Sequence, residues 1–167
     1  MKKSFLILMI AGFLVIGLSE IQAQTMQPKL NQVELMKQFI GTWECELSKD
    51  TILTIEFSPL GSGIVAKAEV TTKGKTLDEL VQLWGFDEKT NNEVIVQLWK
   101  SNPNLRMLTG WWTSKNTAQV IPYQNLSKPE DATETVNSEL KTPDLWIETH
   151  SFNGKVIAVF KFIRIKK

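Results

Sequence analysis

Apolar and polar residues alternate along most of this chain, which is typical of β-strands with two different faces. From Thr42 onwards the alternation recurs in short runs that are separated by polar turns. The predicted strands are residues 42–48, 52–58, 64–72, 79–86, 93–100, 105–113, 118–124, 133–140, 145–152 and 156–165. Asn153-Gly154 is the strongest hairpin signal between them. No helical pattern interrupts the runs, so we predict an all-β fold: an antiparallel up-and-down β-barrel of about ten strands.

One short N-terminal helix precedes the strands. Leu30, Val33, Met36 and Ile40 recur at helical spacing, and Gly41 is placed to end the helix.

Several predicted strands have two apolar faces. A sheet with a single core has one apolar and one polar face, but the strands at 79–86, 93–100 and 156–165 are apolar on both. We expect one of two arrangements. Either the barrel is lined with apolar groups and covered outside by the helix, or an outer face contacts another subunit, as in a homodimer.

One of these faces mixes aromatic and polar side chains, which is the composition of ligand cavities. The six tryptophans of the chain strengthen this interpretation, since each buries a large area while its indole N–H needs a partner. The predicted ligand-binding residues are Gln82, Trp84, Phe86, Gln97, Trp99, Trp146, Glu148, His150 and Phe152. We expect the aromatic residues to line a cavity and Gln82, Gln97 and His150 to be its polar anchors.

Glu148 and His150 share one strand face, about 7 Å apart along the strand. Glu148 could therefore orient His150 or share a proton with it, as a general base, a metal site or a haem ligand requires. His150 is the single histidine, so a zinc site would need carboxylates as its other ligands. We predict no catalytic residue, no metal site and no cofactor, and we leave an enzymatic role as an alternative.

The first 23 residues form a predicted signal peptide. Lys2 and Lys3 precede the apolar stretch 5–18, and Ala23 offers a small residue before a cut ahead of Gln24. The 167-residue chain then leaves one domain, residues 24–167. The protein is expected to be exported, to the periplasm or outside the cell. The apolar run is short for a membrane span, so no stable span is expected after processing.

The charge balance argues against two classes of partner, and the cysteine count argues against an internal disulfide. Without Lys2, Lys3 and Glu20, the 19 basic and 18 acidic residues become 17 of each. A neutral chain argues against a nucleic acid or an anionic membrane as partner, because both need a basic patch. The lone Cys45 alternates with Trp43 and Leu47, so we interpret it as a buried thiol that forms no internal disulfide.

Gly41-Thr42-Trp43, after a short helix and at the start of a meander, resembles the Gly-x-Trp signature of lipocalins and the wider calycin superfamily. The resemblance implies that Trp43 plugs the closed end of the barrel and that Arg164 packs across it. The chain lacks the Thr-Asp-Tyr element of true lipocalins, and ten strands exceed their usual eight. It is therefore more similar to lipocalin-like barrels of exported bacterial proteins, or to ten-stranded fatty-acid-binding and nitrobindin-type barrels.

Together these features predict an exported lipocalin-like protein that binds a small apolar or amphipathic molecule in a barrel cavity, without catalysis. Two alternatives remain. One is a haem-binding nitrobindin-type barrel, or an enzyme, that uses His150 and Glu148. The other is an interaction module that oligomerises through its second apolar face.

Overall fold

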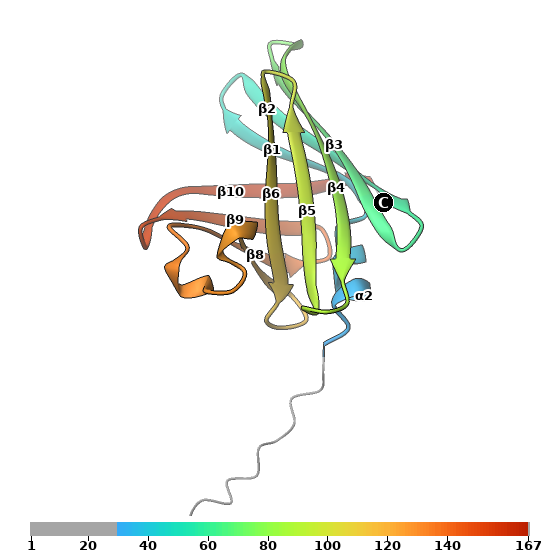
Figure 1. Ribbon diagram of the computed structural model, residues 1–167. Coiled ribbons are helices and arrows are strands. Elements are labelled where there is room, and N and C mark those ends of the chain that lie inside the picture. Colours follow the sequence, from blue (N-terminus) through green and yellow to red (C-terminus); the bar gives the residue numbers. More distant parts are fainter. Residues whose placement is uncertain (1–29, 167) are drawn as a thin grey trace, which may run out of the picture.

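The structure, a computed structural model, describes residues 30–166. Ten strands form a closed antiparallel barrel in which each strand pairs with the next along the chain and β1 pairs with β10 (Figure 1). The predicted all-β up-and-down barrel is therefore confirmed. The predicted signal peptide, residues 1–23, lies outside the described residues.

All ten predicted strands are present. They are β1 (Gly41–Ser48), β2 (Thr51–Leu60), β3 (Gly63–Thr72), β4 (Lys75–Asp87), β5 (Asn92–Trp99), β6 (Asn102–Trp112), β7 (Thr117–Pro122), β8 (Glu134–Thr142), β9 (Leu145–Phe152) and β10 (Lys155–Lys166). The largest differences from the prediction are at strand starts, since β4 begins four residues early and β6 three residues early. β7 stops two residues early, at Pro122, because residues 123–125 form the 3-10 helix η2.

Two hairpins turn on a pair of consecutive residues that both have positive φ. Asn153 and Gly154 have φ angles of 51° and 72° between β9 and β10, as the sequence pattern predicts. Lys73 and Gly74 do the same between β3 and β4, with φ angles of 49° and 74°. Positive φ at both central residues matches the twist of the flanking strands, so this second turn lets β4 start directly after it.

The N-terminal helix consists of α2 (Gln32–Met36) followed by the 3-10 helix η1 (Lys37–Phe39). The Asn31 side chain caps it by accepting a bond from the Glu34 amide at 3.2 Å, so the helix begins later than the apolar spacing predicts. No helix among residues 30–166 has the length and hydropathy needed to span a membrane.

The helix does not cover the outside of the barrel, which corrects one of the two expected arrangements. It lies at one end of the barrel, as Figure 1 shows. The Gln32 side chain donates to the carbonyl of Trp112 at 3.1 Å and accepts from its amide at 2.6 Å, and Met36 and Phe39 are buried. Outward-facing Leu83 and Met107 consequently stay exposed. A homodimer contact through this outer face stays a prediction.

Phe39 brings a cluster of aromatic rings together at the closed end, which we call the floor. Its ring lies 4.9–5.7 Å, between centroids, from those of Phe57, Trp84, Trp112 and Trp146. Two of these four pairs, those with Trp84 and Trp146, meet edge to face, which is a favourable geometry for aromatic quadrupoles. The floor is therefore a packed plug.

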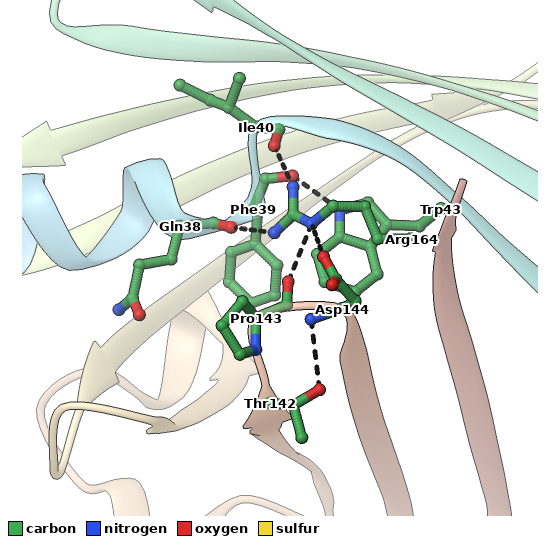
Figure 2. A network of polar contacts seen from close by, with 8 residues as sticks. All are labelled: Gln38, Phe39, Ile40, Trp43, Thr142, Pro143, Asp144 and Arg164. Atoms are coloured by element: carbon green, nitrogen blue, oxygen red, sulfur yellow. Dashed lines mark hydrogen bonds and ion pairs between the residues drawn. The ribbon is translucent and has the colours of Figure 1, made fainter. Parts of the chain in front are cut away.

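Arg164 of β10 ties the floor to the wall (Figure 2). Its guanidinium lies 4.0 Å above the centroid of the Trp43 ring. It also donates to the carbonyls of Gln38, Ile40 and Pro143, at 2.7 Å to Gln38 and 2.9 Å to Pro143. Trp43 in turn donates from its indole nitrogen to the Phe39 carbonyl at 2.7 Å. One cation thus satisfies the carbonyls at the end of η1 and holds them against β1.

We expect Arg164→Lys to lower the free energy of unfolding by roughly 2–4 kcal/mol, because a lysine keeps the charge but cannot reach three carbonyls in one plane. Chemical denaturation monitored by circular dichroism measures the change. The matched control is Lys161→Arg, at an exposed position of the same strand, which should shift stability by less than about 0.5 kcal/mol. Equal effects of the two substitutions would show that Arg164 does not hold the floor.

Candidate functional site

The barrel encloses a cavity of about 560 Å³ above the floor. All ten strands and Phe39 contribute lining side chains. Aliphatic and aromatic groups dominate the lining, with a few polar groups among them. The volume falls within the roughly 300–1,000 Å³ of small-molecule sites.

Eight of the nine predicted ligand-binding residues line this cavity. They are Gln82, Trp84, Gln97, Trp99, Trp146, Glu148, His150 and Phe152. Phe86 does not, because it lies one step beyond Trp84 along β4, beside Glu93 at the barrel end. Parity therefore predicts which face points inward, while the position of the floor decides where the cavity stops. Binding by these residues stays a prediction.

Two glutamines and a tryptophan form a polar chain on the β4–β5 wall. The Gln82 amide nitrogen donates to the Gln97 oxygen at 2.9 Å, and the Trp84 indole donates to the Gln82 oxygen at 2.8 Å. The Gln97 amide nitrogen has no hydrogen-bond partner among residues 30–166, although Gln97 is buried and lines the cavity. This chain therefore offers a donor to a cavity occupant.

Glu148 and His150 face the cavity from β9, nearly opposite β5 in the barrel. His150 Nε2 lies 3.1 Å from Glu148 Oε2, and Ser138 Oγ approaches Glu148 Oε1 at 3.5 Å. The Phe160 ring meets the imidazole edge to face, with centroids 5.0 Å apart. The structure thus brings the predicted pair into contact. In the described part of the chain, no three His, Cys, Asp or Glu side chains gather to hold a metal ion.

The mouth of the cavity carries an ion pair that the sequence analysis missed. Arg106 of β6 donates to the Glu134 carboxylate of β8, and both side chains line the cavity. The two residues lie 28 positions apart, and their strands are separated by β7. No local pattern pairs them, since it is the pairing of β6 with β7 and of β7 with β8 that brings their strands close.

Glu93 of β5 is the charged side chain that is most deeply buried among the described residues, at 1% exposure. Its Oε1 accepts a bond from the Trp112 indole nitrogen at 2.7 Å. Burial raises the pKa of Glu93 to about 7, and the Trp112 bond opposes this rise only in part. Oε2 has no partner among residues 30–166, and the side chain lines the cavity. A buried carboxyl therefore faces the cavity from its floor.

Glu93 was also missed, because it follows the polar loop 87–92 and resembles a solvated strand end. The parity signal was nevertheless present. Glu93 shares the inward face with Ile95 and with two of the predicted ligand-binding residues, Gln97 and Trp99.

The surroundings of two further inward-facing side chains, Cys45 and Trp146, indicate a structural role. Cys45 is buried on β1, and desolvation raises the pKa of its thiol, so it matches the predicted unreactive thiol. The Trp146 ring stacks on Phe162, with centroids 4.1 Å apart. Its indole nitrogen is buried without a hydrogen-bond partner among the described residues. Ring packing therefore holds Trp146 in place.

No protein-family model matches the chain, and none of the curated proteins compared with it matches either.

We expect Glu93→Gln to remove a pH-dependent loss of stability. The pKa of Glu93 rises from 4.5 to about 7 in the folded state, so the folded protein binds this proton more tightly than the unfolded chain does. The native protein should lose stability relative to this variant as pH rises from about 4.5 through 7, by on the order of 3 kcal/mol. Urea denaturation at pH 5 and pH 8 measures the difference.

The control for this charge change is Glu44→Gln, on the outward face of β1, beside the exposed Ile163 of β10. Parallel stability curves for the native protein and Glu93→Gln between pH 5 and pH 8 would contradict the expectation.

Proposed function

We propose that this protein is an exported lipocalin-like barrel that binds a small apolar or amphipathic molecule in its cavity, without catalysis. The observation that carries the proposal is the cavity itself, about 560 Å³ of largely apolar space that is closed at one end by the floor. A core that needed only stability would be filled to the density of an organic crystal. Retained space with a few polar groups is what a ligand site requires.

Two features of the sequence support the lipocalin-like family and the export of the protein. Gly41-Thr42-Trp43 resembles the lipocalin signature, and Trp43 lies under the Arg164 guanidinium at the closed end, as that resemblance implies. Residues 1–23 have the pattern of a signal peptide, which supports export to the periplasm or the outside of the cell.

A hydrophobic fluorescent dye tests the cavity. Val136 of β8 lines it, so Val136→Trp should fill part of the space and weaken dye binding at least tenfold. The matched control is Val96→Trp, which makes the same substitution on β5 beside the outward-facing Leu83 and Met107. It should change binding less than threefold. Fluorescence titration gives both dissociation constants.

Dye that binds the Val136→Trp variant as tightly as the native protein would place binding outside the cavity. Undetectable binding to the native protein at near-millimolar dye would count against a ligand-binding role altogether.

The haem and enzyme alternatives depend on His150. Its side chain is 34% exposed, and its Nδ1 has no hydrogen bond among residues 30–166. This geometry leaves one ring nitrogen available to a ligand, as an axial contact to iron needs.

We expect no Soret shift when the purified protein is mixed with hemin, because Glu93, Glu134 and Glu148 outnumber the basic side chains of the cavity and oppose the carboxylates of hemin. Absorption spectra of the native protein and of His150→Ala decide the question. A shifted Soret band that His150→Ala abolishes would replace the proposed function with haem binding.

A further inference from the structure

The charged side chains of the cavity do not balance. In the described lining they are Glu93, Arg106, Glu134, Glu148 and His150. Arg106 is paired with Glu134 at the mouth, and His150 is in contact with Glu148. Glu93 alone among them has no cationic or imidazole partner, and its one bond comes from a neutral indole. The lining therefore holds more acidic than basic side chains, and the acid without a basic neighbour, Glu93, lies on the floor.

The elements around Glu93 supply no cation from outside either. On α2 and η1, Glu34 and Lys37 pair with each other at the surface, at 2.7 Å. β4 ends at Asp87, whose carboxylate accepts bonds from the turn at Lys89 and Thr90. On the β6 side, Glu93 pairs with Gly110, which has no side chain and so supplies no cation. The carboxyl is thus desolvated and uncompensated, with one oxygen unused.

The groups near Glu93 are aromatic. Trp112 binds its other oxygen, and the Phe39 ring lies 5.6 Å from the Trp112 ring and 5.5 Å from the Trp84 ring. Aromatic faces attract organic cations, and the attraction is strongest where water is excluded. A carboxylate with aromatic neighbours is a receptor for a protonated amine, whereas it repels a carboxylate.

We propose that Glu93 recognises an amino group, so that the ligand is a small apolar molecule with a protonated amine at the end that enters first. This inference rests on the proposed function and names its ligand class. The ammonium donates to Glu93 Oε2, and the apolar body lies along the aliphatic and aromatic wall towards the mouth. A fatty-acid anion would have to bury its charge against Glu93 or break the Arg106–Glu134 pair.

Three probes with the same ten-carbon chain separate the head groups: decylamine, 1-decanol and decanoate. Isothermal titration calorimetry at pH 8 should give decylamine a dissociation constant at least tenfold below that of 1-decanol, with decanoate the weakest. Glu93→Gln keeps an acceptor for Trp112, and it should weaken decylamine binding at least tenfold while leaving 1-decanol within threefold. Glu44→Gln should match the native protein with every probe.

A pH series on the native protein gives a second measurement that needs no variant. A primary alkylamine resembles lysine and stays protonated at both pH 6 and pH 8. Because the pKa of Glu93 lies near 7, the preference for decylamine over 1-decanol should fall several-fold at pH 6. Histidine is the other side chain that ordinarily changes charge in this pH range, so the same series on Glu93→Gln must be flat. A series that is not flat would assign the preference to His150 and Glu148 and overturn the proposal.

The remaining outcomes are also decisive. Binding of all three probes with no amine preference, or tighter binding of decanoate, overturns the amine inference and leaves the proposed function standing. Absence of binding by every probe overturns both. If circular dichroism shows that Glu93→Gln is unfolded, an amine preference in the native protein that is unchanged between pH 6 and pH 8 overturns the inference.

Discussion

The cavity depends on the contact between Arg164 and Trp43, because that contact closes one end of the barrel. A ten-stranded cylinder that was open at both ends would be a tube through which water could pass. Here one guanidinium covers the Trp43 ring and binds the carbonyls that η1 leaves unpaired, so the helix end becomes part of the wall. Phe39 then lies among four other rings and seals the end. The cavity, its mouth and the buried position of Glu93 all follow from this closure.

The strands could be predicted from the sequence because each one satisfies local rules. Side chains alternate with a period of two, and a turn such as Asn153-Gly154 accepts the backbone angles that a tight hairpin demands. The same parity placed Gln82, Trp84, Gln97 and Trp99 on one face, and the structure places all four in the cavity lining. The alternation along a strand also determines whether a side chain points into the barrel or away from it, so the residues of the cavity wall could be predicted.

The position of the helix, the extent of the cavity and the burial of Glu93 depend on how the end of the barrel is closed, which no local pattern encodes. One of the two arrangements expected from the sequence placed the helix on the outer face, whereas Gln32 finds its partner in Trp112, 80 residues away, at the barrel end. Phe86 has the inward parity of its strand yet lies beyond the cavity, because the floor intervenes. Glu93 resembled a solvated acid until the floor was known to bury it. These misses share one cause, which is that the ends of a barrel are formed by residues far apart in the chain.

The same closure sets the order in which the protein can be completed. β1 is the first strand of the barrel to be synthesised, yet one of its edges pairs only with β10, and Arg164 reaches Ile40 across 124 residues. As the chain emerges from the ribosome, that edge stays open until nearly the whole barrel has been made. An open, apolar strand edge can pair with other chains, so a nascent chain that stalls before β10 is prone to aggregation. The last strand therefore determines both the shape of the finished cavity and how long the unfinished chain must be shielded from its neighbours.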